Sequence, residues 1–406
     1  MLERVFPGSA SRNAELVLLL GLAFVFPLYE APKNIFGVLF FVIWAVNRWR
    51  SSQWGGPWGR WDAVIAASIL LALAGTPFAG IKGGEWLGAR DVVRTFLFLW
   101  CLVRAGYSRE QWLAVFISLI AGTLLATAIG AWQFAGSNKE GLELHSIGHS
   151  NHTATYLCTV FGVAAAMLSG MWTCIAARWR AVLAVVLGLI AVAVVATGSR
   201  VAVVCLPIAV LLAVAPHLRR SWKPLLAVSG VLAVSAVLLV ASDPWVLRKH
   251  VRNIDSQNVL AYRDLLWERA VTAWRAHPVF GIGMDNFSRI STDQYRKWTA
   301  EQGRSWDPAR DFLAPHAHSL YFDTLAERGM LGVVAVLLFF IAWIASLARG
   351  FFRMTERHEW VAWTAAALAL LTTSFIGLVN STFHNEQAAV AMICLAAWLS
   401  RGRKVP

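Results

Sequence analysis

Long apolar segments recur along almost the whole of this 406-residue chain. Each run is about 16 to 24 residues long, which is the length that a helix needs to cross a hydrocarbon core of roughly 30 Å. Hydrophobic residues make up 58% of the sequence and charged residues only 15%, a balance that a soluble domain does not show. We therefore predict an all-α polytopic membrane protein, whose structural unit is a helical bundle.

Glycine, proline and charged residues mark the boundaries of about twelve predicted spans. The second and fourth spans are short, and the sequence at 197–200 could separate two helices or break a single one. The chain then divides into spans one to nine (1–242), a long loop (243–317), and spans ten to twelve with a tail (318–406). The spans are expected near 14–30, 34–48, 61–79, 91–106, 110–134, 151–173, 178–197, 199–217, 223–242, 328–349, 358–380 and 385–400.

The net charge of +13 has a topological explanation. In a soluble protein it would suggest a nucleic-acid partner, but here the basic residues gather in alternate short loops, as the positive-inside rule requires. This distribution predicts cytoplasmic termini, an outward-facing long loop and no nucleic-acid partner. Two of the basic clusters are Arg48, Arg50 and Arg60, and Arg401, Arg403 and Lys404.

The five cysteines all lie in or beside apolar segments, without CxxC or Cys/His spacing. We interpret them as small packing residues. The sequence has no DxD pair, HExxH motif or carboxylate cluster at ligand spacing, so no metal site is expected. No cleavage pattern for a signal peptide follows the first apolar run.

The long loop contains an amphipathic segment, "NVLAYRDLLWERAVTAWRAHP". Its apolar residues recur at helical spacing, and His277-Pro278 would stop the helix. The turn "GIGMDNF" follows. The polar and aromatic remainder suits an interfacial lid.

Unusual polar residues open several predicted spans at the same, outward end. Asn151 and His152 open span six, Arg200 opens span eight, and His318 opens span ten. Taken singly, Arg200 is typical of a helix-end arginine that snorkels to lipid headgroups, and Asn151 and His152 are typical of helix starts. Together with Arg263 of the long loop, they converge on one face.

This combination points to a type of chemistry. Arginine presents a planar fork of donors that matches phosphate oxygens, and a neutral histidine can accept a proton from a hydroxyl group. Two arginines and a histidine therefore favour attack by a hydroxyl on a phosphate-linked donor. The arginines would neutralise the charge that a metal neutralises elsewhere.

Three stretches resemble motifs of the O-antigen ligase and O-antigen polymerase superfamily. They are "HSLYFDTLAERGMLG", "TGSRVAVV" and "YRDLLWERAVTAWRAHPVFGIGMDNF". In the first, a histidine is followed nine residues later by glutamate and two further on by glycine. The matching residues are His318, Glu327 and Gly329, then Arg200, then Arg263, Trp267, Pro278, Gly281 and Gly283.

The resemblance implies a glycosyltransferase of the GT-C type on the periplasmic face of a Gram-negative inner membrane. It would transfer a glycan from undecaprenyl diphosphate to lipid A-core, without metal, nucleotide or other cofactor, and with inversion. By analogy, His318 is the general base, and Arg200 and Arg263 hold the diphosphate. Membrane lipids surround the protein, and we expect a monomer.

One position departs from the family pattern, because Ser319 stands where asparagine usually follows the histidine. Glu327 has an alternative role as an anchor for the helix near Arg328 or another arginine. The residues expected to contact substrate are His316, Ser319, Asn151, His152, Trp267, Arg269 and Glu327.

Three other functions stay open. An O-antigen polymerase uses a second lipid-linked glycan as its acceptor, and a protein O-oligosaccharyltransferase uses a pilin hydroxyl. The chain ends soon after the last span, which favours the ligase over the protein-glycosylating type. A lipid-linked sugar transporter would need polar groups along a path through the bundle, whereas here they collect on one face.

Overall fold

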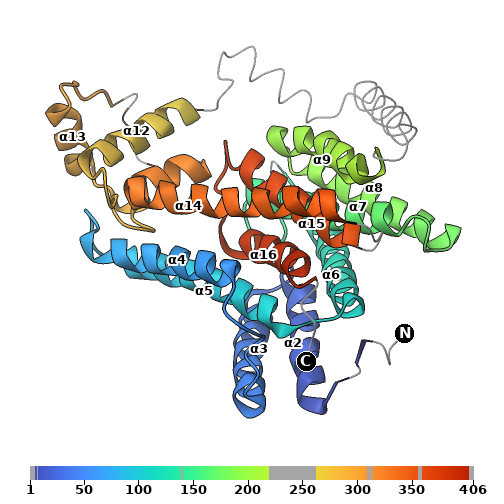
Figure 1. Cartoon of the computed structure of the whole chain (residues 1–406). Helices are drawn as coiled ribbons and strands as arrows, with labels where there is room; N and C mark the ends of the chain where they lie inside the picture. The colour runs from blue at the N-terminus through green and yellow to red at the C-terminus, as the bar shows by residue number, and fades with distance from the viewer. Residues whose placement is uncertain are drawn as a thin grey trace.

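The protein is described by a computed structural model, which covers residues 5–401 except 7, 138, 140, 219–261, 309–310, 312–313 and 355–358. The described residues form helices and connecting turns (Figure 1). The N-terminal half contains α2 (Ala10–Val25), α3 (Glu30–Ser51), α4 (Arg60–Gly75), η1 (Thr76–Phe78), α5 (Glu85–Ala105), α6 (Arg109–Ala135), α7 (Ser150–Met171), α8 (Ala177–Ala196) and α9 (Arg200–Leu218). The remainder contains α12 (Arg263–Ala276), η2 (Phe287–Arg289), α13 (Thr292–Glu301), α14 (Leu320–Arg353), α15 (Glu359–Leu371), η3 (Thr372–Ile376) and α16 (Asn385–Leu399).

Seven helices of the described chain are long and apolar enough to cross a membrane, so the prediction of a polytopic membrane protein is confirmed. A helix occupies the place of every predicted span except 223–242, which lies outside the described residues. The total of twelve spans therefore stays a prediction. The two spans that looked short are helices of 22 and 21 residues, α3 and α5. Gly198, with φ of 73°, separates α8 from α9.

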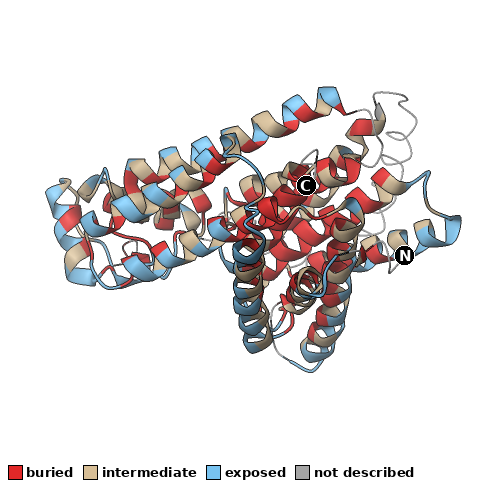
Figure 2. Ribbon diagram, turned by 60° about the horizontal axis from the view of Figure 1, so that its bottom comes forward, coloured by how far each residue is buried: buried red, intermediate tan, exposed pale blue. Residues whose placement is uncertain are grey.

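The core of the bundle lies around α7, which packs against α15, α8, α9 and α16. Figure 2 shows the buried residues concentrated in these central helices, with exposed residues along the outer ones. Most of α7 consists of small or β-branched residues, so neighbouring backbones approach it closely. Gly162 and Gly170, for example, lie directly against Leu368 and Val361 of α15.

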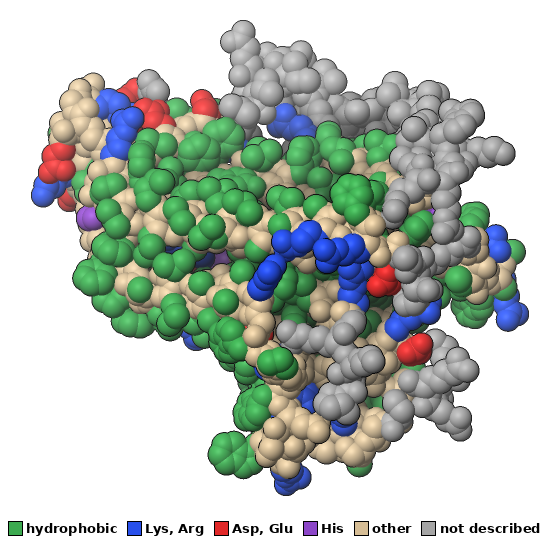
Figure 3. All heavy atoms as spheres, in the orientation of Figure 1, with side chains coloured by type: hydrophobic (Ala, Val, Ile, Leu, Met, Phe, Trp, Pro, Cys, Tyr) green, Lys and Arg blue, Asp and Glu red, His purple; other side chains and the backbone are tan. Residues whose placement is uncertain are grey.

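Hydrophobic side chains cover the face that α14 and α4 present to the surroundings (Figure 3). Val334, Leu338 and Ile341 of α14, and Leu70 of α4, are all exposed. An exposed apolar surface of this extent is expected where acyl chains replace water.

Two arginines at one end of the bundle are buried in ion pairs. Arg48 contacts Glu15 at 3.3 Å, and Arg104 contacts Asp62 at 2.8 Å. Because an unpaired charge is costly in this environment, each arginine ties two helices together at one end of the bundle.

The opposite end, at which α5, α7, α9, α14 and α16 begin, is here called the site end. A small lobe covers part of it, and α12, η2 and α13 pack around Ile282, Phe287 and Tyr295. The predicted amphipathic helix is confirmed as α12, which ends at Ala276 before His277. Through α12, the lobe rests on the first turns of α14.

Candidate active site at the start of α14

Ser319 begins α14 by capping it. Its hydroxyl accepts a hydrogen bond from the Phe322 amide at 3.4 Å and donates one to the Gly377 carbonyl at 3.3 Å. Serine and asparagine are both good N-cap residues, which explains how serine can stand at this position. Ser319 is almost completely buried and engaged with backbone groups, so it positions the start of α14, while its contact with substrate stays a prediction.

His318 has a left-handed backbone, with φ of 51°. This conformation is unfavourable for a residue other than glycine and persists only where neighbours impose it. On one side, the Ala317 amide donates to Asp323 at 2.7 Å. On the other, the Leu320 amide donates to the Gly377 and Asn380 carbonyls at 2.9 and 3.1 Å. The imidazole is therefore aimed by a backbone fixed on both sides.

Arg263 reaches this region from the first turn of α12. One turn further along, the Trp267 ring stacks on Phe322 of α14, with ring centroids 5.1 Å apart and planes at 13°. This aromatic contact packs α12 against α14 and brings Arg263 near His318. The Nε atom of Arg263 is buried and has no hydrogen-bond partner among the described residues. Trp267 thus positions an arginine, and it remains a predicted substrate contact.

Arg263 lies within electrostatic range of both other predicted catalytic residues, His318 and Arg200. Burial, and next the Arg263 guanidinium, lower the pKa of His318 from 6.5 to about 4. Burial and the neighbouring Arg200 lower the pKa of Arg263. Arg200 opens α9 immediately after the Gly198 turn. Near pH 7, His318 is therefore a neutral imidazole near the Arg263 guanidinium, and Arg263 in turn lies near Arg200.

A polar cavity of about 400 Å³ adjoins the site. His152, His316 and His384 line it together with Asp323. The His316 and His318 rings have their centroids 6.4 Å apart. Burial, and next His316, lower the pKa of His384. The predicted contacts His316 and His152 therefore face a volume that could hold sugar hydroxyls.

Asn151 and His152 also hold the bundle together at this end. The Asn151 carbonyl accepts a hydrogen bond from Asn380 at 3.1 Å, and the His152 carbonyl accepts one from Gln387 at 3.1 Å. Since the Asn380 carbonyl also accepts from Leu320, this residue joins the starts of α7 and α14. The backbone of Asn151 has this structural part, whatever its side chain contacts.

The loop after α12 is bound to α14 along the backbone. The Ile282 and Gly283 amides donate to the Ala326 and Glu327 carbonyls, each at 2.9 Å. In return, the Met330 amide donates to the Pro278 carbonyl at 2.9 Å. The close approach requires glycine, because a Cβ atom at Gly281 would lie 2.4 Å from the backbone of Glu327.

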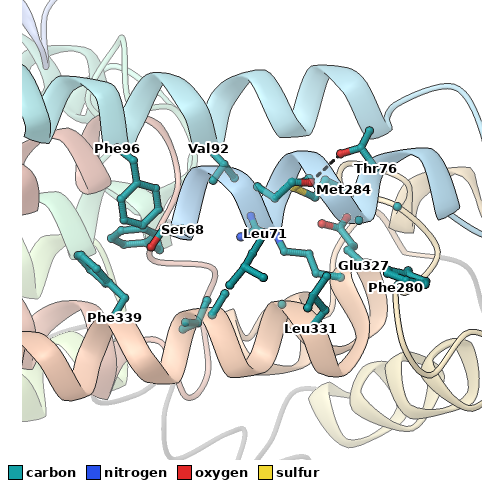
Figure 4. A pocket seen from close by; sticks show the side chains of 18 of the residues that line it. Ser68, Leu71, Thr76, Val92, Phe96, Phe280, Met284, Glu327, Leu331 and Phe339 are labelled. Carbon is teal, nitrogen blue, oxygen red and sulfur yellow. Dashed lines mark hydrogen bonds between the residues drawn. The ribbon is translucent and has the colours of Figure 1, made fainter. Parts of the chain in front are cut away.

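Glu327 fastens the same loop with its side chain. Its carboxylate accepts a hydrogen bond from the Phe287 amide at 3.3 Å. The side chain also lines the polar cavity and the apolar crevice that runs between α4, α5 and α14. Figure 4 shows Glu327 at one end of this crevice, and Phe96 and Phe339 at the other. The expected anchoring role therefore acts on the loop, in addition to any contact with arginine.

Arg269, which the sequence predicts to contact substrate, is enclosed within the small lobe. It is 1% exposed and donates to the Ala314 and Phe287 carbonyls at 3.0 and 3.3 Å. Its guanidinium also lies over the Phe287 ring, 4.8 Å from the centroid. Arg269 thus occupies the core of the lobe and holds its loops together, and its contact with substrate stays a prediction.

Three residues at the site end escape prediction from the sequence. His149 caps α7 and is one of the groups that lower the pKa of His318. Arg328 lines the polar cavity, and its buried Nε has no partner in the part of the chain that the structure describes. Asn380 joins α7 to α14. Only Arg328 carried a signal, since an arginine inside an apolar helix is uncommon.

The break in α14 at Gly329 gives a prediction about stability. Gly329 has φ of 58° and ψ of −159°, a region that only glycine adopts readily, and a Cβ there would lie 2.5 Å from the Val279 backbone. Gly329→Ala is expected to lower the free energy of unfolding by about 3 kcal/mol or more. The measurement is the midpoint of thermal unfolding, followed by tryptophan fluorescence.

The matched control is Gly188→Ala in α8. Gly188 lies inside a helix, and its Cβ would meet no atom within 4 Å. This change should be neutral or stabilise the protein by about 0.5–1 kcal/mol. An unchanged midpoint for Gly329→Ala would contradict the role of the break.

Comparison with known families gives one result. Residues 183–337 match the family described as O-antigen ligase. The matched region contains Arg200, Arg263 and His318, whereas the start of α7 and His384 lie outside it. No curated protein matches the chain.

Proposed function

We propose, from the match of residues 183–337 to the O-antigen ligase family, that this chain is an O-antigen ligase of the GT-C type. It would transfer the glycan from undecaprenyl diphosphate to a hydroxyl of lipid A-core during lipopolysaccharide biosynthesis. In this proposal the protein lies in the bacterial inner membrane and the site end faces the periplasm. The basic residues near the other end and the shared position of the polar residues support that orientation.

The proposed reaction is a direct displacement at the anomeric carbon. The acceptor oxygen bonds to this carbon while the bond from the carbon to the diphosphate oxygen breaks, so the configuration inverts. His318 takes the proton from the attacking hydroxyl and later releases it to water. Arg200 and Arg263 stabilise the negative charge that grows on undecaprenyl diphosphate as it leaves.

The observation that carries the proposal is the position of Arg263. The Arg200 charge lowers the pKa of Arg263, and the Arg263 charge in turn lowers the pKa of His318. The buried Nε of Arg263 lacks a partner among the described residues, and Arg200 adds a second positive charge nearby. A diphosphate fits this pair of guanidinium groups, and it would place the anomeric carbon beside the base.

A reconstituted transfer assay tests the function. Purified protein in nanodiscs is mixed with a polyprenyl-diphosphate glycan and lipid A-core, in the presence of EDTA, and products are resolved by mass spectrometry. If the protein is a ligase, the product is glycosylated lipid A-core. Product formed only from two donor molecules would instead indicate a polymerase, and product formed only on a pilin would indicate a protein O-oligosaccharyltransferase.

The lowered pKa of His318 predicts an unusual pH dependence. Since His318 has a pKa of about 4 in the protein without substrate, its imidazole stays neutral well below the ordinary pKa of 6.5. In the pH profile of kcat/KM, the midpoint of the acidic limb should therefore lie near pH 4, because kcat/KM reports the pKa values of the free enzyme. Initial transfer rates measured at low donor concentration, from pH 8 downward, provide the check.

In the pH profile of kcat, bound diphosphate should move the acidic limb to higher pH. Its negative charge favours the protonated imidazole, so the pKa of His318 in the complex rises. We expect the kcat limb to lie at a higher pH than the kcat/KM limb. A kcat/KM limb at the ordinary 6.5 would contradict the idea that buried His318 is the base.

A further inference from the structure

A second groove opens at the site end, between α3 and α5. It has a volume of about 590 Å³ and is also lined by residues of α2 and α16. Thr95, Asn385 and Glu386 line both this groove and the polar cavity. The groove therefore adjoins the cavity lined by His152, His316 and His384.

The walls of the groove change from polar to apolar along its length. Lys33 and Arg90 lie within two turns of the helix starts at the site end, and Arg94 lies one turn deeper. Further along the same helices, Val38 and Leu97 line the groove and are exposed. This gradient matches an amphiphile whose anionic head lies at the site end and whose acyl chain extends towards the membrane interior.

At the polar end of the groove, two positively charged guanidinium groups outnumber the one carboxylate that pairs with them. The side chains of Arg90 and Arg94 are 65% and 50% exposed, and both contact the same Asp91 oxygen, at 3.2 and 3.6 Å. Two guanidinium groups thus share one carboxylate, so this trio carries a net positive charge. Lys33 is already paired with Glu30 and Glu386, which leaves the two arginines as the groups that an incoming phosphate would meet.

The geometry of the proposed reaction requires different positions for the lipid-linked donor and the lipid acceptor. A displacement requires the attacking hydroxyl to approach opposite the leaving diphosphate. The diphosphate is assigned to Arg200 and Arg263, so the acceptor has to come from the side of the cavity. We propose, resting on the ligase function above, that the α3–α5 groove holds the lipid part of the acceptor, a phosphorylated glycolipid of the lipid A type, with its phosphate on Arg90 and Arg94.

Binding, measured separately from transfer, tests this assignment. Full-length protein in phosphatidylcholine nanodiscs is titrated with lipid A-core that carries its phosphates and with the same molecule after enzymatic dephosphorylation. Wild-type protein should bind the phosphorylated form about tenfold more tightly, a difference of ~1.4 kcal/mol. Arg90→Gln combined with Arg94→Gln should abolish this preference and bind both forms equally.

The control removes two charges at the opposite end of the bundle, through Arg60→Gln and Arg178→Gln. Both arginines are exposed and lie outside the groove. This control should keep the preference for phosphate. The assignment is overturned if the groove variant also keeps the preference, if the control loses it equally, or if phosphatidylglycerol displaces lipid A-core at equal concentration.

The transfer assay separates this proposal from the function itself. Protein that binds phosphorylated lipid A-core through the two arginines but transfers no glycan to it would refute the ligase function and leave the groove assignment standing. Transfer without any preference for phosphate would do the reverse. Each result therefore decides one of the two claims.

Discussion

Replacing His318 with asparagine should lower kcat about 10²- to 10⁴-fold, the usual contribution of a general base. Asparagine is the informative substitution because it tolerates the left-handed backbone that His318 adopts, with φ of 51°. His318→Ala removes the base too, but it adds backbone strain. Transfer is measured as initial rates with purified protein, and the midpoint of thermal unfolding is recorded for both variants.

Two controls separate base chemistry from positioning. His316→Asn changes a ring whose centroid is 6.4 Å from that of His318 and should mainly raise the KM for the acceptor. His318→Gly leaves room for added imidazole, which should restore part of the rate as its neutral form becomes available with rising pH. If His318→Asn retained wild-type kcat, or if imidazole rescued nothing while acceptor binding was normal, His318 would not be the base.

The sequence predicts the helices well because hydropathy and helix length respond to the same bilayer thickness. α12 is also predictable, since its apolar residues recur at helical spacing and His277-Pro278 ends it. The start of α14 is harder to predict from the sequence. Span ten was placed from residue 328, but the helix begins at Leu320 and is interrupted at Gly329, where the backbone of the 278–283 loop inserts against it.

The sequence does not show which residues far apart in the chain contact each other in the fold. Arg269 looks like a surface charge on an amphipathic helix, yet carbonyls from two later loops enclose it. Arg48 and Arg104 look like loop charges, yet each meets a carboxylate of another helix. In each case a partner far along the chain decides whether an arginine is structural or free to bind an anion.

Replacing Arg263 with alanine should lower kcat/KM about 10²- to 10³-fold, as expected for removing one donor that stabilises developing negative charge. Arg263→Lys keeps the charge but loses the forked geometry, so it should recover only part of this activity. Arg275→Ala is the matched control, because it removes an exposed arginine from the last turn of the same helix. It should transfer glycan at the wild-type rate.

The Arg263 variant also predicts a change in pH dependence that a purely structural role would not produce. The Arg263 charge is one cause of the low pKa of His318, because a nearby cation disfavours protonation of the imidazole. Removing it should raise that pKa from about 4 towards 6.5, so the acidic limb of kcat/KM moves to higher pH. Arg263→Lys should leave the limb near its wild-type position. If Arg263→Ala lowered the rate without moving the limb, the arginine would act on the diphosphate alone, and the electrostatic link between base and anion site would be wrong.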